Sequence, residues 1–317
     1  MSAFQVGVIT VCVLIAGLDG FDVLVVAFTA TALAAEWTLS PSALGVVLSA
    51  GLAGMGVGAL VMGPAGDRLG RRPAVLLSLV GLAAGMAFSA AATSAGVFSA
   101  TRFFTGLWIG GVLANINIVV IETSSDRWRK FNIALMTIGY PIGATLGGLA
   151  AVYLLSASGW RSVYWFGAVA AVVLFPLAWV WTPRRRAEAP SARQSKVSLL
   201  AVFAPAYRTQ MLAACAAYFC VMMTVYFLLS WTPRTMTELG FSTTAGISGS
   251  LLMNIGGVIG CILYGLLADR LGARRLGTAI IVGLFLLSAM FGFVPPVQST
   301  LLLAALAVGA TPSRAGS

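Results

Sequence analysis

Long apolar blocks, separated by short polar segments, make up most of this sequence. A helix that crosses a lipid bilayer needs about 20 mostly apolar residues. Nine blocks reach that length, whereas a tenth, from residue 300 to 310, is too short. The pattern therefore predicts an all-α transmembrane protein. The nine predicted spans are residues 6–33, 44–62, 74–92, 97–121, 131–155, 163–181, 211–231, 246–267 and 276–293.

The composition points to the same environment. Hydrophobic residues make up 59% of the chain and charged residues 9%, and the mean hydropathy is +0.97. Such a chain carries more apolar surface than a soluble core can bury. We therefore expect the lipid bilayer to surround it.

The positive charge is concentrated in alternate polar segments. Most of the 19 lysines and arginines lie there, for example in residues 68–72, 127–130 and 184–186. Basic residues accumulate in cytoplasmic loops, so we expect a multi-pass protein of the inner (plasma) membrane with a cytoplasmic N-terminus. Because the net charge of +10 does not gather on one basic face, we expect no nucleic acid as a partner.

The sequence offers little for enzyme chemistry. It contains no histidine, no nucleotide-binding loop and no nucleophile placed near a base. Its four cysteines lie inside apolar blocks, without the spacing of a disulfide framework or a metal site. We expect no catalytic residues, no metal and no cofactor other than a proton gradient. Without histidine, a proton carried at neutral pH must be bound by a carboxylate.

A charged hairpin occurs twice in the chain. Residues 63–72 follow the pattern G-x-x-x-D-R-L-G-x-R, and residues 265–274 repeat it between the eighth and ninth blocks. Such a repeat is typical of internally duplicated transporters. We predict an N-terminal six-helix bundle (residues 1–182), a cytoplasmic linker (183–210) and an incomplete C-terminal bundle (211–317).

The hairpin suggests a conformational role rather than substrate binding. Its glycines permit a tight turn, Asp67 offers an acceptor to a helix N-terminus or an arginine, and the arginines anchor at the inner surface. The candidate gating residues are Gly63, Asp67, Arg68, Gly70, Arg71, Arg72, Gly265, Asp269, Arg270, Gly272 and Arg274.

These features resemble the major facilitator superfamily, which carries this hairpin between helices 2 and 3 and a weaker copy between helices 8 and 9. Within it, the chain is most similar to the aromatic acid:proton symporters. The matching stretches are D-G-F-D at residues 19–22, R-F-F-T-G at 102–106 and G-Y-P-I-G at 139–143. The resemblance implies two six-helix bundles, of which this chain would hold nine to ten of twelve helices. It also implies proton-coupled transport of a small aromatic carboxylate by alternating access.

Two aspartates in the first block are the main candidates for coupling. Asp19 and Asp22 are three residues apart, so they share one face of a helix. An aspartate at mid-membrane costs about 2.5 to 3.5 kcal/mol on insertion scales, so the two need a polar cavity, a cation or a proton. We expect at least one to couple proton or substrate movement. The alternative is that one of them only holds its helix against a neighbour.

Arg102 is predicted to lie at the same depth as Asp22. At a rise of about 1.5 Å per residue, Asp22 lies about 6 Å and Arg102 about 8 Å below the outer edge of the bilayer core. We therefore predict an ion pair, or an Arg102 that receives an organic carboxylate when Asp22 is protonated. The alternative is that Arg102 extends to the outer headgroups.

Other polar residues in the apolar blocks allow two interpretations each. Glu122 ends the fourth block at its inner mouth and shares a face with Asn115, so it is either a coupling and gate residue or a solvated helix end. The candidate cavity residues are Asn115, Tyr140, Tyr226 and Asn254. The asparagines are equally suited to interhelical hydrogen bonds, and membrane helices often carry aromatic residues.

Taken together, the residues favour a secondary active transporter that takes up a small organic carboxylate, with aromatic acids preferred, together with a proton. An efflux antiporter of the same superfamily is an alternative, because the glycine-rich fifth block loosely resembles the antiporter pattern. The short tenth block leaves a third possibility, a truncated remnant that transports nothing.

Overall fold

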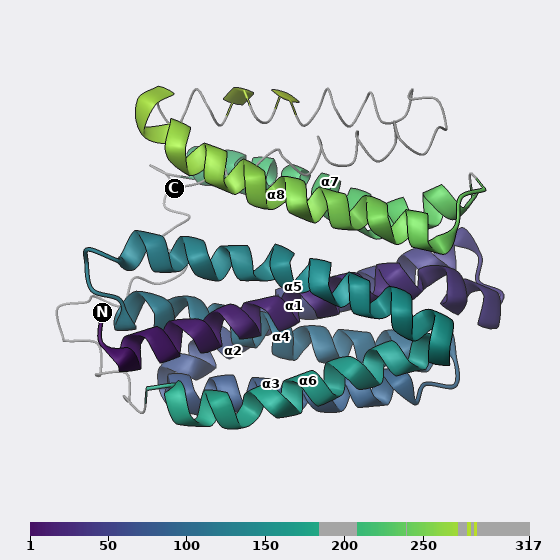
Figure 1. Ribbon diagram of the computed structural model, residues 1–317, viewed down its shortest axis with the longest axis horizontal. Helices are drawn as coiled ribbons and strands as arrows, with labels where there is room; N and C mark the ends of the chain where they lie inside the picture. Colours follow the sequence, from purple (N-terminus) through teal and green to yellow (C-terminus); the bar gives the residue numbers. More distant parts are fainter. Residues whose placement is uncertain (184–207, 239, 272–277, 280–281, 284–317) are drawn as a thin grey trace.

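The computed structural model in Figure 1 describes residues 1–183, 208–238, 240–271, 278–279 and 282–283. Its named elements are all helices, so the predicted all-α fold is confirmed. They are α1 (Ala3–Glu36), α2 (Pro41–Leu69), α3 (Arg71–Ala90), α4 (Ala95–Thr123), α5 (Arg129–Ser158), α6 (Trp160–Trp181), α7 (Arg208–Glu238) and α8 (Thr243–Leu271).

Seven of the first eight predicted spans lie inside one of these helices, and the third, residues 74–92, extends two residues beyond the end of α3. Among the described residues, α1 to α6 contain apolar segments long enough to cross a membrane. Most of the ninth span and the whole tenth block lie outside the described residues. The division of the chain into two bundles and a linker therefore stays a prediction.

Local signals in the sequence set the helix ends. Ser2 and Gln5 form a reciprocal capping box at the start of α1, each side chain accepting a hydrogen bond from the other's backbone N–H. Gly70 separates α2 from α3 with a φ of +96°, in the left-handed region that favours glycine. The hairpin glycine therefore makes the sharp turn expected of it.

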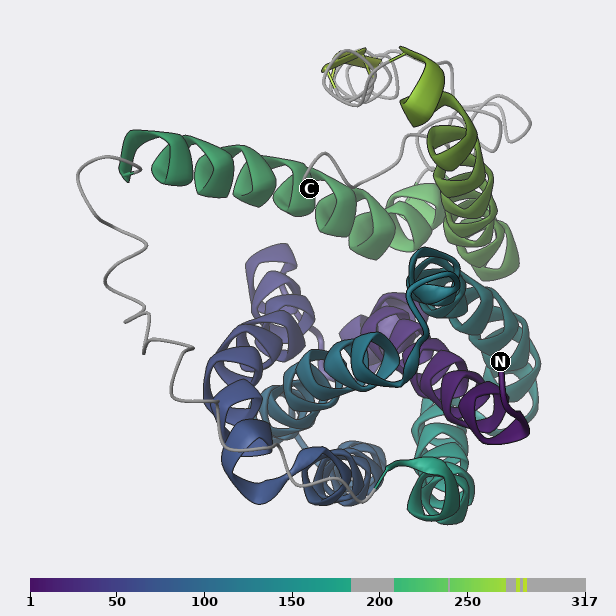
Figure 2. The same ribbon diagram turned by 90° about the vertical axis from the view of Figure 1, so that its left-hand side faces the viewer.

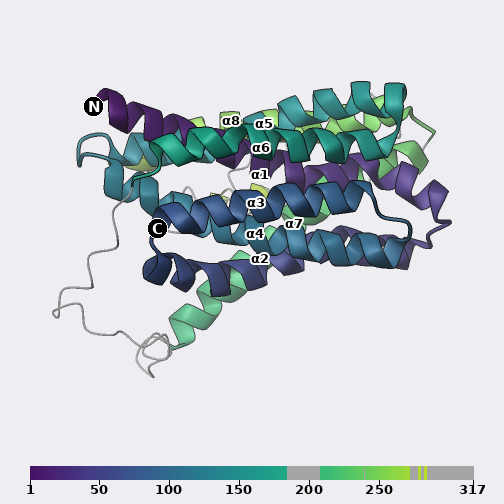
Figure 3. The same ribbon diagram turned by 90° about the horizontal axis from the view of Figure 1, so that it is seen from below.

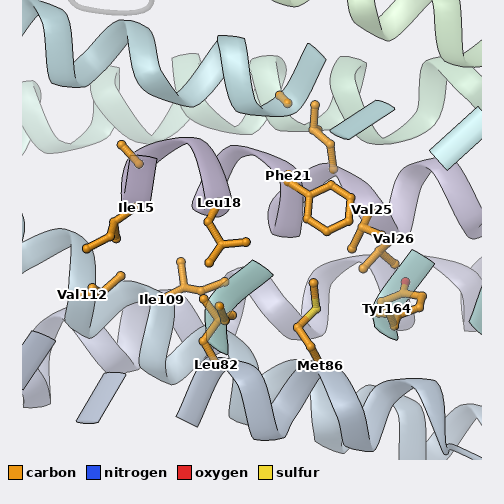
Figure 4. Packing of buried hydrophobic residues seen from close by; sticks show 14 of the residues in the cluster. Ile15, Leu18, Phe21, Val25, Val26, Leu82, Met86, Ile109, Val112 and Tyr164 are labelled. Atoms are coloured by element: carbon orange, nitrogen blue, oxygen red, sulfur yellow. The ribbon is translucent and has the colours of Figure 1, made fainter. Parts of the chain in front are cut away.

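Helix α1 lies in the interior of the helical bundle (Figures 1 and 2). Figure 4 shows Leu18 of α1 near Leu82 of α3 and Ile109 of α4, and Val26 of α1 near Tyr164 of α6, all members of one buried cluster. On the side of the bundle shown in Figure 3, α3 and α6 pack against each other. The central position of α1 explains why its polar residues need partners inside the protein.

Helices α7 and α8 form a layer beside the first six (Figures 1 and 2). They pack against each other, and α7 contacts α1 while α8 contacts α5. Leu251 of α8 lies so close to Gly148 of α5 that a Cβ on this glycine would overlap it. Residues of α7 can therefore approach those of α1, and residues of α8 those of α5.

Glycines bring two pairs of helices into backbone contact. Between α2 and α4, a Cβ on Gly58 would overlap the carbonyl group of Leu107. Between α1 and α5, a Cβ on Gly143 would overlap the backbone of Gly17. Small residues allow such close approach in membrane proteins, where van der Waals packing drives helix association. These contacts fix how α4 and α5 lie against their neighbours.

We predict that Gly58→Ala destabilises the protein, whereas Gly56→Ala does not. The Cβ at position 58 meets backbone atoms, and overpacking of this kind costs about 1 to 3 kcal/mol. At position 56, a Cβ meets no described neighbouring atom within 4 Å, so the variant keeps the helix-propensity gain of about 1 kcal/mol. Thermal unfolding in detergent measures both variants. Equal midpoints would contradict the close α2–α4 contact.

Candidate substrate and proton site

Asp22 of α1 and Arg102 of α4 form a buried ion pair. Arg102 Nη1 donates to Asp22 Oδ1 at 2.8 Å, and Nη2 donates to Oδ2 at 2.6 Å and to the backbone oxygen at 3.0 Å. Each residue is only 1% exposed. Bidentate pairs of opposite charge are among the stronger hydrogen-bonded contacts in proteins. This contact links α1 to α4 in the interior.

Asp22 and Arg102, which the sequence predicts at similar depths, are therefore in direct contact. Arg102 is directed to Asp22, not to the outer surface as in the alternative. The contact itself assigns no role in transport to either residue.

Tyr164 of α6 completes the surroundings of Arg102. Its ring centroid is 5.8 Å from the guanidinium carbon, and its hydroxyl shares a 2.9 Å hydrogen bond with Thr29 of α1. Met86 Sδ lies 3.6 Å from Arg102 Nη1. The sequence patterns did not single out Tyr164. The depth argument would not have found it, because Tyr164 lies only one residue into the predicted span 163–181, whereas Arg102 lies five residues into the span 97–121.

Asp19 is buried beside this pair but is not part of it. It is 2% exposed and interacts electrostatically with Asp22. Within the described structure its Oδ1 atom has no hydrogen-bond partner. A buried carboxylate without a cation is costly to ionise, because desolvation is not offset. The two aspartates thus occupy different environments one helical turn apart.

Two tyrosines extend the cluster to α5 and α7. Tyr140 of α5 interacts electrostatically with both aspartates and with Tyr226 of α7. Gly20, which lies between the aspartates, packs directly on the backbone of Tyr140, where a Cβ would overlap its carbonyl oxygen. The structure therefore brings together Asp19, Asp22, Arg102, Tyr140 and Tyr226, from four helices.

In the described structure the two asparagines predicted to line the cavity form hydrogen bonds with groups other than Asp22 and Arg102. Asn254 of α8 is 5% exposed and donates to the Ser250 carbonyl of its own helix at 2.9 Å. Asn115 of α4 accepts a hydrogen bond from Arg71 Nη1 at 3.3 Å and donates to the carbonyl of Met62 at 3.2 Å. The structure thus places Asn115 with the hairpin rather than with Arg102, because the hairpin packs against this part of α4.

Arg71 is the centre of the hairpin contacts. It pairs with Asp67 through Nη2, and its Nε atom lies 3.8 Å from Glu122 Oε1. The Arg71 side chain is 9% exposed, whereas those of Asp67 and Glu122 are 60% and 54% exposed. Asp67 therefore binds an arginine, one of its two expected partners. Glu122 lies at an exposed helix end that also contacts the hairpin.

The remaining gating candidates differ in how much the structure describes. Arg72 lies over the Trp179 ring of α6 with 4.6 Å between its guanidinium carbon and the ring centroid, and Arg68 is exposed. Gly63 is partly exposed within α2. In the second hairpin, Gly265, Asp269 and Arg270 belong to α8, and Gly272 and Arg274 lie outside the described residues.

At the other end of the bundle, Glu36 of α1 forms hydrogen bonds with two residues of α6, an interaction called here the Glu36 clamp. Arg161 donates to both of its carboxylate oxygens, at 2.7 and 3.0 Å, and Trp160 Nε1 donates at 2.6 Å. Phe98 of α4 packs edge-on against Trp160 and against Tyr164. This aromatic cluster connects the clamp with the residues around Arg102.

Comparison with known proteins assigns the fold to a family. Residues 10–313 match the Major Facilitator Superfamily. The chain belongs to this superfamily. A gallate transporter of Pseudomonas putida is 30% identical over 306 residues, which cover 87% of this chain and 68% of that protein. A 3-(3-hydroxy-phenyl)propionate transporter of Escherichia coli (strain K12) is 31% identical over 302 residues, covering 93% and 72%.

Solved structures of superfamily members share the fold. A D-xylose-proton symporter superposes with a TM-score of 0.72 at 17% identity, covering 98% of this chain and 81% of the symporter. A mutant of the nucleoside transporter NupG gives a TM-score of 0.76 at 16% identity, covering 97% and 79%. This facilitator is therefore an integral membrane transporter, which is consistent with the prediction that it is not an enzyme.

We predict that Arg102→Leu destabilises this facilitator more than the double variant Asp22→Leu/Arg102→Leu. Removing only the arginine leaves a buried carboxylate without its cation, a loss of about 3 to 5 kcal/mol, whereas an apolar replacement of both partners is far less costly. Thermal unfolding of the two single variants and the double variant gives the coupling energy. Additive losses would show that the pair contributes no mutual stabilisation.

Proposed function

We propose that this facilitator takes up a small aromatic carboxylate together with a proton, by alternating access of two bundles. The observation that supports this most directly is the buried Asp22–Arg102 pair with Asp19 unpaired beside it. The pair supplies a cation for the substrate carboxylate. The two aspartates supply places for the proton.

Charge counting explains why a proton should accompany the substrate. The ion pair alone is neutral, so a substrate carboxylate that joins Arg102 leaves one uncompensated negative charge. Burying an unpaired charge is strongly unfavourable. A proton on Asp22 restores neutrality and weakens its hold on Arg102, which frees the guanidinium for the substrate. Loaded and empty sites then carry the same net charge.

Asp19 is the better suited of the two aspartates to take up the proton first. Its Oδ1 atom has no partner in the described structure, whereas Asp22 accepts hydrogen bonds on both carboxylate oxygens. A carboxyl group near another carboxylate and without a cation favours its neutral form. When the substrate arrives, this proton can pass to Asp22, one helical turn away, and a second proton reloads Asp19, so that both carboxyl groups are neutral in the loaded site.

The preference for aromatic acids rests on the tyrosines and on the relatives. Tyr140, Tyr164 and Tyr226 place aromatic rings around the charged groups, and offset or edge-on contacts between rings favour a flat substrate. The similar proteins named above are transporters of gallate and of 3-(3-hydroxy-phenyl)propionate. A 4-hydroxybenzoate transporter of Acinetobacter baylyi is 28% identical over 93% of this chain.

The hairpin would serve as the inner gate in this proposal. Arg71 joins α3 to Asn115 and Glu122 of α4, so it ties together helices that must shift when the inner side opens. With the N-terminus in the cytoplasm, these contacts would lie at the cytoplasmic face of the inner membrane. No cofactor is needed beyond the proton gradient.

Uptake by reconstituted vesicles tests the proposal. The chain is placed in liposomes, and entry of benzoate, 4-hydroxybenzoate and gallate is measured with an inward proton gradient, with an uncoupler, and with the gradient reversed. We expect gradient-driven accumulation that the uncoupler abolishes. Accumulation unaffected by the uncoupler would contradict symport, and export driven by an inward proton gradient would favour the antiporter alternative.

We predict that Asp19→Asn separates exchange from proton-driven uptake. Asparagine resembles a permanently protonated carboxyl group. The variant should therefore still exchange labelled for unlabelled benzoate. Accumulation driven by the proton gradient should fall by roughly tenfold or more, the scale of a buried ionisable group's contribution. Asp126→Asn is the control, because its side chain is 92% exposed and pairs only with nearby Arg129 in the described structure. Wild-type accumulation by Asp19→Asn would exclude Asp19 as the proton carrier.

A further inference from the structure

Helices α3 and α6, which pack against each other on the side shown in Figure 3, form a groove with a volume of about 450 Å³. One of its ends lies where α3 begins and α6 ends. The groove is apolar along its length and carries a positive charge at this end. Its lining includes Arg72, Leu76, Leu77 and Val80 of α3 and Phe175 and Trp179 of α6.

The groove runs along the helix axes. Arg72, Leu76 and Val80 are four residues apart, so they share one face of α3. Phe175 and Trp179 are also four residues apart, and their rings stack with centroids 6.2 Å apart. From Arg72 to Val80, α3 rises by about 12 Å at 1.5 Å per residue. One leaflet makes up half of the roughly 30 Å hydrocarbon core, so the groove extends through most of a leaflet.

Arg72 supplies the charge at the end of the groove. Its guanidinium carbon lies 4.6 Å from the centroid of the Trp179 ring, and the residue is 9% exposed. A cation over an indole ring is attracted by the ring's electrons. The positive end of the α3 dipole lies at the same place, because α3 begins at Arg71 after Gly70, which has no side chain to cap it. Both features favour a negatively charged group here.

A second cavity continues beyond the charged end. It has a volume of about 400 Å³ and shares Arg72 and Trp179 with the groove. Phe4 of α1 and Thr182, directly after α6, also line it. Trp179 lies two residues before the end of α6, and tryptophans are enriched where a membrane meets water. Space for a polar group therefore adjoins the apolar groove, with Arg72 between them.

We propose that α3 and α6 bind an anionic phospholipid, with one acyl chain in the groove and the headgroup phosphate beside Arg72. A guanidinium suits phosphate oxygens because its N–H groups are paired in one plane. Basic pockets between membrane helices on the cytoplasmic side bind anionic headgroups in this way, and this end of the bundle is the one predicted to be cytoplasmic. The lipid site is separate from the Asp22–Arg102 pair and does not depend on the proposed transport function.

The test measures lipid binding to the purified protein in detergent by native mass spectrometry. Phosphatidylglycerol and phosphatidylcholine with the same acyl chains differ in net charge. Arg72→Gln removes the cation, and Val80→Trp fills the groove but keeps Arg72. Arg127→Gln is the matched control for the first variant, because Arg127 lies over the Trp128 ring at 5.6 Å but is exposed and does not line the groove. Val173→Trp, at an exposed position of α6 outside the groove lining, is the control for the second.

We expect the wild-type protein to bind phosphatidylglycerol more tightly than phosphatidylcholine. Arg72→Gln should lower the affinity for phosphatidylglycerol by roughly fivefold, the share of one basic residue at a charged membrane surface, and leave that for phosphatidylcholine unchanged. Val80→Trp should weaken the binding of both lipids. Both control variants should keep the wild-type affinities, and inorganic phosphate should not displace the bound phospholipid.

Equal affinity of Arg72→Gln and the wild-type protein for phosphatidylglycerol would overturn the proposal. An equal loss in Arg127→Gln would also overturn it, because the effect would then follow from net charge alone. If Arg72→Gln does not fold, Val80→Trp decides, since unchanged lipid binding in that variant excludes the groove. Displacement by inorganic phosphate would show that the acyl chain contributes nothing and would exclude a phospholipid site.

Discussion

The pairing of Asp22 with Arg102 is the interaction on which the interior of the described bundle depends. Taking two charges out of water costs several kcal/mol each, and the attraction between them offsets this only with good geometry and further hydrogen bonds. Both conditions are met, through the bidentate contact and the additional bond to the Asp22 backbone. A pair of this kind adds little stability over apolar residues. Its presence in an interior this apolar is therefore better explained by function than by folding.

Glycines determine where that pair can lie. Gly20 allows the backbone of Tyr140 to approach α1 between the two aspartates, and Gly51 lies beside the Arg102 guanidinium, where a Cβ would be 3.8 Å from Nη2. The first glycine brings α1 and α5 together, and the second belongs to the close contact between α2 and α4. A larger side chain at either position would change the surroundings of the charged groups without touching the pair itself. The functional cluster is thus positioned by residues that carry no chemistry of their own.

Much of this arrangement could be predicted from the sequence. The apolar blocks located α1 to α8, because length and hydropathy alone identify membrane helices. The depths of Asp22 and Arg102 agreed because both helices rise by about 1.5 Å per residue from opposite surfaces. Depth does not say which side of a helix meets which neighbour, however, so Asn115 was expected in the cavity and lies against the hairpin. Tyr164 was missed because it lies at the start of its predicted span, at a depth that does not match Arg102.

The α2–α4 contact offers a physical connection between the site and the hairpin. Helix α4 carries Arg102 near one end and Glu122 about 30 Å further along its axis, and α2 carries Gly51 and Asp67 in the same order. Glycines hold these two helices in backbone contact between the ends. Tightly packed interfaces shift between discrete arrangements rather than deform continuously. A shift of α4 at Arg102 can therefore move α2 and α4 together as one rigid pair and so displace the hairpin. The ion pair connects α2 and α4 to α1, the helix that carries both Asp19 and Asp22.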